Sequence, residues 1–371
     1  MTPEDAPPAS GIAEVVSLRE FRALAEPIVE PAAFDYVNGG SWDELTLAGN
    51  EAAWLRYRLR PRVLVDVSRI DPSTTLLGAR ASFPVAIAPM AAHGLANPAG
   101  ETATAAAAAE AGIPFTLSTM SSRSIEEVAA AAPGGTRWFQ LYAQADPHRT
   151  RELVERAAAA GYGAIVLTVD LPDLGYRERD RRSGFDLSVP LGNFGPDAGP
   201  THAGHGADDG TEPGYEVLEE WLARNLTWDS LATIRSWSSL PLVLKGILTA
   251  EDARLAAEHG VDAIVVSNHG GRQLDRVPAA IDVLEEIAAS VPGMEVLVDG
   301  GVRRGLDVAI ALALGARGVL VGRPVLWALA AGGQAGVARA LAILREEFEI
   351  ALTLLGAPRP AGIRREHVAT G

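Results

Sequence analysis

The chain has 371 residues, of which 48% are hydrophobic and 21% are charged, a composition that can bury a large core. Its formal net charge is −15, and it contains no cysteine. The charge argues against a broad nucleic-acid or anionic-membrane surface, because phosphate groups demand a basic footprint. The absence of cysteine excludes disulfides, thiolate nucleophiles and cysteine-held metals. We therefore expect a soluble globular protein that acts on a small molecule, with local cations if that molecule is an anion.

The N-terminal sequence MTPEDAPPAS is acidic and rich in proline. It lacks the basic region and apolar stretch of a secretory signal, and no apolar run approaches the roughly 20 residues that span a bilayer. We predict a flexible lead over residues 1–16, a cytoplasmic location and no membrane partner. From Ser17, as an N-cap, the pattern predicts two short helices outside any barrel, ending at Gly39 and Gly40.

From about residue 80 the sequence alternates short apolar runs with amphipathic helical stretches. Runs so continuous in apolar residues are typical of parallel strands covered on both sides. Eight of them occur, over residues 84–90, 113–119, 137–142, 164–170, 241–246, 263–268, 295–300 and 318–323. Eight β–α units predict an α/β protein with a closed (β/α)8 TIM barrel, and we expect a single domain over residues 17–371.

One interval between apolar runs is much longer than the others and predicts an insertion over residues 171–240, after the fourth strand. Its middle is rich in Gly, Pro, Asp and His, and we expect this part to be mobile. The end of the insertion, around Trp221 and Trp228, predicts a helical segment. In a barrel such an insertion lies over the C-terminal mouth, where a lid belongs, although a featureless surface loop is the alternative.

Polar residues cluster at the C-terminal ends of the predicted strands, the face on which barrel enzymes build active sites. Taken singly, a lysine at a strand end is usually a solvated rim residue, and a lone histidine is usually structural. Their convergence from separate strands favours a catalytic site, with His269 as a base and Asp170 as the carboxylate that orients its ring. The residues are Gln140, Tyr142, Thr168, Asp170, Lys245, Ser267, His269 and Asp299.

The segments DGGVRRG and GRP follow the seventh and eighth strands, where TIM barrels commonly bind phosphate. Gly301 and Gly322 free the backbone to approach a ligand, and Arg303 and Arg323 add positive charge, although glycines there also serve tight turns. There is no GxxxxGK[ST] loop, and the histidines show no HxxxH or HExxH spacing. We therefore predict a phosphate site, but neither nucleoside triphosphate chemistry nor a metal.

Together these segments resemble the FMN-dependent 2-hydroxy-acid oxidase family, which includes glycolate oxidase, lactate oxidase and mandelate dehydrogenase. The match covers essentially residues 17–370 and rests on FQLY, TVD, LKG, SNHGGRQLD, DGGVRRGLDV and GRP, in the family's order and spacing. The resemblance implies FMN as cofactor, a small anionic (S)-2-hydroxy acid as substrate, dioxygen as electron acceptor, and a homotetramer.

The resemblance also implies the catalytic roles. His269 is then the active-site base, held by Asp170, and removes a proton either from the substrate hydroxyl with hydride transfer or from Cα through a carbanion. Tyr142 contacts the substrate hydroxyl or the developing negative oxygen. Lys245 lies at the edge of the flavin ring, where a cation favours electron uptake.

Substrate and cofactor contacts are implied in the same way. The substrate carboxylate is held by Arg177, Arg272 and the hydroxyl of Tyr36, since guanidinium forks suit a planar carboxylate. Further contacts to the flavin ring are Ala88, Pro89, Met90, Ser118, Gln140, Thr168 and Ser267. The phosphate is held by Gly301, Arg303, Gly322 and Arg323, with Asp299 on the ribityl chain.

Departures from the family pattern bear on the substrate. Met120 stands where several members carry an aromatic residue, and Phe34 replaces a frequent tyrosine, which predicts a more apolar and adaptable pocket. Such a pocket fits lactate or a larger 2-hydroxy acid better than glycolate. Asp173 and Tyr176, after the fourth strand, stand where other residues are common, which leaves the lid contacts open.

Several outcomes of the reaction stay open. A peroxide-forming oxidase is the first hypothesis, and a dehydrogenase with a quinone or protein acceptor is a second. A monooxygenase-like outcome is less favoured, because of Ala91 after the first strand and a short lid. An FMN barrel isomerase, or a phosphate-ligand binding barrel without redox chemistry, would share the phosphate loops but would not need Tyr36, Arg177, His269 and Arg272 to converge on a carboxylate.

Overall fold

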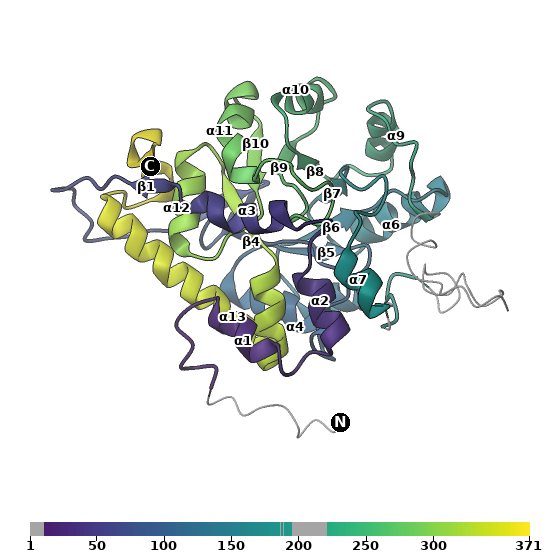
Figure 1. Ribbon diagram of the computed structural model, residues 1–371. Coiled ribbons are helices and arrows are strands. Elements are labelled where there is room, and N and C mark those ends of the chain that lie inside the picture. The colour runs from purple at the N-terminus through teal and green to yellow at the C-terminus, as the bar shows by residue number, and fades with distance from the viewer. Residues whose placement is uncertain (1–10, 186, 188, 195–220) are drawn as a thin grey trace.

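Eight parallel strands form a closed barrel in the computed structural model, which describes residues 11–185, 187, 189–194 and 221–371 (Figure 1). The ring follows chain order and closes where β11 pairs with β4. The predicted TIM barrel and all eight of its strands are confirmed. Their bounds are β4 Val85–Ile87, β5 Phe115–Ser118, β6 Arg137–Leu141, β7 Ile165–Thr168, β8 Leu242–Ile247, β9 Ala263–Val266, β10 Glu295–Val298 and β11 Gly318–Val321.

Helices follow the strands and surround the barrel (Figure 1). Their starts carry local signals: Ser124 forms a capping box with Glu127, and Asp146 caps a helix whose first residue is Pro147. The helices are α4 Gly100–Ala111, α5 Ile125–Ala131, α6 Pro147–Ala159, α7 Glu178–Ser183, α9 Ser230–Ser236, α10 Ala250–Glu258, α11 Ala280–Ser290, α12 Gly305–Ala313 and α13 Arg323–Leu355. By length and hydropathy alone α13 could cross a membrane, but 61% of its most apolar window is buried and it packs on α4 and α12, as a core helix does.

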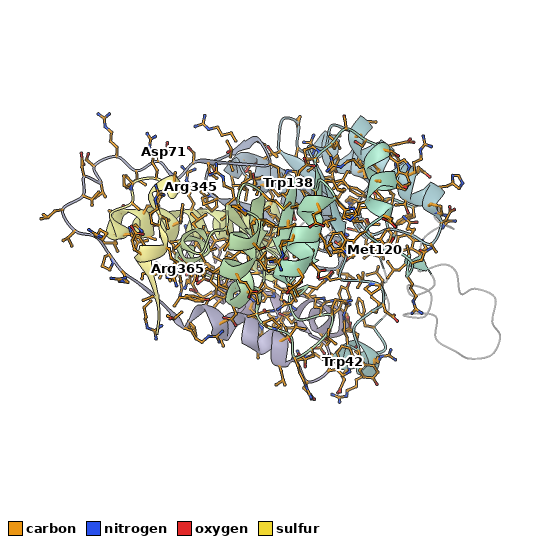
Figure 2. All side chains as sticks on the ribbon, turned by 90° about the horizontal axis from the view of Figure 1, so that it is seen from above. Trp42, Asp71, Met120, Trp138, Arg345 and Arg365 are labelled. Carbon is orange, nitrogen blue, oxygen red and sulfur yellow. The ribbon has the colours of Figure 1, made fainter. Side chains whose placement is uncertain are left out.

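The barrel interior is filled with side chains, Trp138 among them (Figure 2). Its apolar core combines small and large residues from seven of the eight strands, all but β5, and Leu76 and Ala81 of the hairpin formed by β2 Thr74–Leu76 and β3 Ala79–Ala81 join this core. A filled interior leaves the C-terminal mouth as the face on which a site can form.

The N-terminal segment differs in part from the sequence prediction. The two expected helices are present as α1 Glu20–Ala25 and α2 Pro31–Asn38, and Gly39 ends the second. Ser17 is not the N-cap of α1, because its hydroxyl donates to the Glu20 carboxylate one turn further on. Within the predicted flexible lead, the described residues 11–16 pack on the protein: Ile12 and Val15 are buried.

A third N-terminal helix, α3 Leu45–Trp54, was not predicted. It is followed by β1 Tyr57–Leu59, which pairs with β12 Val368–Thr370 near the C-terminus. The chain then passes through the hairpin of β2 and β3 into the barrel. The pairing of β1 with β12 joins the segment that precedes the barrel to the C-terminal residues.

In the insertion after β7, the glycine-rich middle predicted to be mobile lies outside the described residues. At its end α9 begins just after Trp228, whereas Leu222 forms a backbone bridge with Gln144. At its start α7 lies beside α2 (Figure 1). The described parts of the insertion therefore reach the C-terminal face of the barrel.

Candidate active site

A cavity opens at the C-terminal ends of the strands. Most of the predicted site residues line it: Tyr36, Ala88, Pro89, Met90, Tyr142, Arg177, Lys245, His269, Arg272, Asp299, Gly301, Arg303, Gly322 and Arg323. Five others do not line it but lie behind residues that do: Ser118, Gln140, Thr168, Asp170 and Ser267. The structure thus brings together residues that are spread over nearly 290 positions of the chain.

His269 is the centre of a hydrogen-bonded row. Its Nδ1 lies 2.9 Å from Oδ1 of Asp170, and its Nε2 lies 3.4 Å from the Tyr142 hydroxyl. The residue adopts a left-handed backbone conformation, with φ of 57°, and its N–H donates to Oγ of Ser267. Because Asp170 engages Nδ1, the ring presents Nε2 toward Tyr142 as the atom that can accept a proton.

The electrostatics of this row suit a base. Burial lowers the pKa of His269 below its ordinary value and outweighs the opposing effect of Asp170, so the imidazole is neutral near pH 7. Burial opposes ionisation of Asp170, but the neighbouring His269 and Lys245 hold the pKa of its carboxyl below the ordinary value. Burial and the nearby Asp170 raise the pKa of Tyr142, which keeps its hydroxyl protonated as a donor.

The predicted carboxylate clamp is assembled at the side of this cavity. The guanidinium of Arg272 lies 4.8 Å from the centre of the Tyr36 ring and donates to the carbonyl of Gly39 at 3.0 Å. Arg177 is buried, and its Nε donates to the carbonyl of Arg272 at 3.3 Å. The Tyr36 ring stacks on Phe185 with 4.3 Å between centres. Two guanidinium groups and one phenol therefore share one wall of the cavity.

Lys245 provides a buried cation in the wall of the cavity. Its Nζ donates to Oγ of Ser267 at 3.1 Å and lies 3.4 Å from Oδ2 of Asp299. The other oxygen of Asp299 is buried and has no hydrogen-bond partner among the described residues. A buried acceptor without a partner is costly, so this carboxylate is suited to a hydroxyl-bearing ligand in the cavity.

The polar residues behind the cavity are joined by a series of side-chain hydrogen bonds. Oγ of Ser118 donates to Oε1 of Gln140 at 3.0 Å, and Nε2 of Gln140 donates to Oγ1 of Thr168 at the same distance. Such bonds fix the orientation of the Gln140 amide. A planar heterocycle with alternating donors and acceptors could be recognised at this level of the barrel.

The predicted phosphate residues concentrate positive charge near Gly301 and Gly322. Arg323 donates to the carbonyls of Val37, Gly39 and Gly270, each at 3.0 Å. Burial, together with neighbouring arginines, lowers the pKa of Arg323 to about 9. The lowered pKa shows that the charged guanidinium of Arg323 lacks a compensating negative charge nearby. A bound anion would supply that charge and stabilise the guanidinium.

Arg303 and the two glycines complete this region. Arg303 is buried, pairs with Glu51 at 2.7 Å and lies over Trp327. Gly301 has φ of 80°, and a Cβ added there would lie 2.0 Å from the carbonyl oxygen of Asn50. Only glycine fits this position. The buried cations, the close backbone and the unpartnered Asp299 oxygen together fit a phosphorylated polyol such as the ribityl phosphate of FMN.

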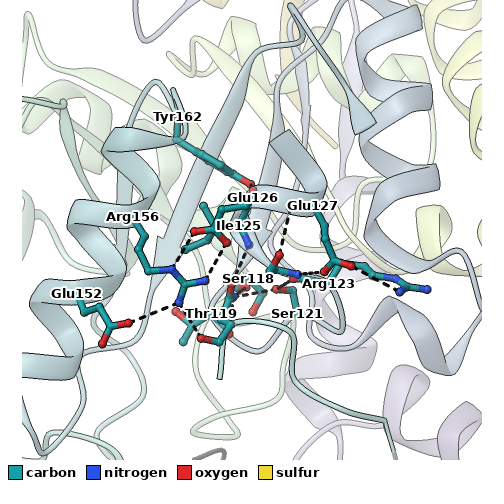
Figure 3. A network of polar contacts seen from close by, with 12 residues as sticks. Ser118, Thr119, Ser121, Arg123, Ile125, Glu126, Glu127, Glu152, Arg156 and Tyr162 are labelled. Carbon is teal, nitrogen blue, oxygen red and sulfur yellow. Dashed lines mark hydrogen bonds and ion pairs between the residues drawn. The ribbon is translucent and has the colours of Figure 1, made fainter. Parts of the chain in front are cut away.

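Ser118, the last residue of β5, and the loop that follows it with Met120 are held by a polar network (Figure 3). Asn193 of the insertion donates to the carbonyl of Thr119 at 3.0 Å, and its Oδ1 accepts from the N–H of Ile125. Arg156 of α6 donates to the carbonyl of Asn193 at 2.8 Å. The network fixes one side of the cavity to the helix layer.

One sequence-based expectation about the substrate pocket is corrected. Phe34 does not line the cavity: it packs on the hydrophobic core, because residues two apart on α2 face different sides and Tyr36 takes the cavity side. Neither Asp173 nor Tyr176 lines it. Asp173 pairs with Arg224 at the surface, and Tyr176 is exposed. Met120 is buried and does line the cavity, as expected.

Sequence reasoning missed the apolar residues that complete the cavity. They come mainly from the insertion, which shows no periodic pattern: Leu171, Leu174, Phe185, Leu187, Trp221 and Leu222. Among the described residues no group of three or more His, Asp or Glu side chains is placed to hold a metal ion.

Known proteins share both sequence and fold with this chain. Residues 25–370 match the family model described as FMN-dependent dehydrogenase. The chain is 49% identical over 359 residues to an L-lactate oxidase of Nostoc sp., covering 94% of this chain and 96% of that protein. It is 46% identical over 361 residues to glycolate oxidase 1 of Zea mays, covering 96% of each.

A solved structure of mandelate oxidase with (S)-4-hydroxymandelic acid superposes with a TM-score of 0.91 at 46% identity, over 96% of this chain and 99% of that one. The likeness therefore extends over the barrel and over the segments that surround the cavity. The chain belongs to the FMN-dependent dehydrogenase family.

Proposed function

We propose that this protein oxidises (S)-2-hydroxy acids to 2-oxo acids and passes the electrons to dioxygen, forming hydrogen peroxide. The observation that carries the proposal is that His269, engaged by Asp170, faces the same cavity as the guanidinium groups of Arg177 and Arg272. A base and a carboxylate clamp in one cavity match a substrate with a carboxylate next to the carbon that reacts. The relatives named as lactate, glycolate and mandelate oxidases support the same class.

FMN, the cofactor of the family, supplies a two-electron acceptor that dioxygen can reoxidise. The residues of this chain that would hold it are those that follow β4, those of the phosphate region, the hydrogen-bonded polar residues behind the cavity, and Lys245. They are Ala88, Pro89, Met90, Ser118, Gln140, Thr168, Lys245, Ser267, Asp299, Gly301, Arg303, Gly322 and Arg323.

The side chains then divide the chemistry among themselves. Arg177 and Arg272 bind the substrate carboxylate, which fixes the hydroxyl-bearing carbon in place. The Tyr142 hydroxyl donates to the substrate oxygen, and Nε2 of His269 accepts the proton that the substrate loses. Asp170 stabilises the imidazolium that results, because an anion 2.9 Å from Nδ1 favours the charged ring.

The preferred substrates are those with an apolar side chain. Apart from the clamp, the cavity wall is largely apolar: Met120, Leu171, Leu174, Phe185, Leu187 and Leu222. Burying a methyl or phenyl group there is favourable by about 25 cal/mol per Å², and glycolate has no such group to bury. We therefore propose lactate or a larger 2-hydroxy acid over glycolate.

The test is to record the flavin spectrum of the purified protein and to add (S)-lactate, (S)-mandelate and glycolate in turn without oxygen. Bleaching, followed after admission of air by reoxidation with one peroxide per 2-oxo acid, is the expected result. Bleaching with slow reoxidation would identify a dehydrogenase, and release of carbon dioxide without free peroxide would identify a monooxygenase outcome. A bound flavin that no 2-hydroxy acid bleaches would refute the substrate class.

We also propose that copies of this chain associate, as a tetramer by the resemblance to the family. Val63 and Leu64 are strongly exposed on the segment between β1 and β2, and association would remove such apolar surface from water. Sedimentation of the purified protein tests this. A cytoplasmic location stays a prediction.

A further inference from the structure

A second cavity lies beside the active-site cavity, between the C-terminal ends of β6, β7 and β8 and the part of the insertion that leads into α9. Three residues line both cavities: Tyr142, Leu171 and Leu222. Side chains that contact two neighbouring cavities lie between them. These three side chains therefore form a partition, of which Tyr142 belongs to the catalytic row.

The backbone around Leu222 is anchored to the loop after β6. Leu222 forms an antiparallel bridge with Gln144, the N–H of Ala145 donates to the carbonyl of Trp221, and the N–H of Ala223 donates to the carbonyl of Ala143, both at 2.9 Å. Leu222 is 5% exposed. A side chain held from both sides by backbone pairing is a fixed wall, and its size decides whether the cavities communicate.

The second cavity has the lining of an alkyl-binding pocket. Beyond the partition its aliphatic side chains are Val169, Leu226, Leu231, Leu244 and Ile247, and Thr168 and Asp252 add polar groups to the same wall. Arg224 and Thr227, which also line it, are exposed and mark its outer rim. A straight hydrocarbon chain that passed the partition would have these aliphatic side chains to pack against.

We propose that Leu222, together with Leu171, limits the length of substrate side chain that the enzyme accepts. With the partition intact, the active-site cavity takes compact side chains. With it opened, the alkyl chain of a medium-chain (S)-2-hydroxy acid extends from the carboxylate clamp into the second cavity. This inference rests on the proposed oxidation of 2-hydroxy acids and names the residues that set its specificity.

The test compares kcat/KM for (S)-lactate, 2-hydroxyhexanoate, 2-hydroxyoctanoate and 2-hydroxydecanoate in the wild type, Leu222→Ala and Leu171→Ala. Each methylene group newly buried is expected to raise kcat/KM about fourfold. The ratio of 2-hydroxyoctanoate to lactate should therefore rise about tenfold or more in Leu222→Ala. Leu226→Ala is the matched control, because it widens the second cavity without touching the partition, and its ratio should stay at the wild-type value.

If Leu222→Ala does not fold, Leu171→Ala still tests the proposal, because the two residues of the partition come from different segments of the chain. Titration with 2-oxooctanoate, followed by the absorbance of the bound flavin, gives a second readout that does not depend on turnover. Tighter binding in either partition variant supports the proposal. Unchanged ratios and unchanged binding in the folded partition variants, with lactate still oxidised, would overturn this inference alone. A wild type that oxidises none of the acids would overturn the proposed function as well.

Discussion

The hydrogen bond between His269 and Asp170 allows a quantitative prediction for Asp170→Asn. The substitution keeps an oxygen that can accept from Nδ1 but removes the negative charge 2.9 Å from it. A hydrogen bond to a charged group contributes about 1.5–3 kcal/mol and a neutral one about 0.5–1.5 kcal/mol, so loss of the charge alone removes about 1–1.5 kcal/mol. If that difference is realised when the imidazole becomes charged, kcat should fall roughly 5- to 13-fold.

The same substitution has a predicted sign in the pH profile. Burial lowers the pKa of His269, and Asp170 opposes that effect. Removing the carboxylate charge therefore lowers the pKa further. Because the base acts in its neutral form, the acid limb of kcat/KM should move to lower pH, even though the maximal rate falls.

The assay is anaerobic flavin bleaching by (S)-lactate in a stopped-flow instrument, repeated across pH. Asp173→Asn is the matched control: it removes a carboxylate from the same loop, but one that pairs with Arg224 at the surface, where ion pairs contribute about 0–1 kcal/mol. A bleaching rate in Asp170→Asn equal to that of the control, or an acid limb that moves to higher pH, would refute the role given to Asp170.

Three further predictions concern the clamp, the phosphate loop and the core. Arg272→Met should raise the KM for lactate roughly 10- to 150-fold in steady-state kinetics, because charge-assisted hydrogen bonds to the carboxylate are lost; an unchanged KM would contradict the clamp. Gly301→Ala should reduce the free energy of unfolding, measured in urea, by about 1–3 kcal/mol more than Gly161→Ala. Both glycines have φ near 80°, but the added Cβ meets Asn50 only in Gly301→Ala, and equal losses would show that this contact is harmless. Burial lowers the pKa of His93, so the unfolded chain binds a proton that the folded chain lacks, and stability should decline as pH falls from about 6.5 toward the lowered pKa. Urea unfolding of His93→Asn should show a shallower decline, and an identical one would exclude His93 as its source.

Much of the site could be predicted because the functional side chains of this fold lie at the C-terminal ends of its strands. In a parallel barrel every strand delivers its C-terminal residues to one face, so a polar residue after an apolar run is already located in space. Asp170 and His269 were paired on this ground, and the structure places them in contact. The phosphate region near Gly301 and Gly322 was located in the same way.

The position of Leu222 in the partition could not be predicted from the sequence. Leu222 reaches the cavity because the backbone of its segment pairs with Gln144, nearly 80 positions earlier in the chain. The residues around Leu222 show no periodic pattern from which this backbone pairing could be predicted. For Phe34 the prediction was wrong. Its position in the family pattern indicated that it lines the substrate pocket, but the helical turn of α2 places Tyr36 there instead.

Helix α3 shows why an element outside the barrel matters to the chemistry inside it. Asn50 and Asn268 exchange two buried amide hydrogen bonds, of 2.8 and 2.7 Å, one residue before His269. From the same helix, the Trp54 indole N–H donates to the carbonyl of Gly300, at the start of the phosphate loop. Because both loops are glycine-rich and adopt left-handed conformations, they need external contacts to stay in one arrangement. A single helix therefore holds the loop of the base and the loop of the phosphate at a fixed separation, which is the geometry that a substrate lying against a bound cofactor requires.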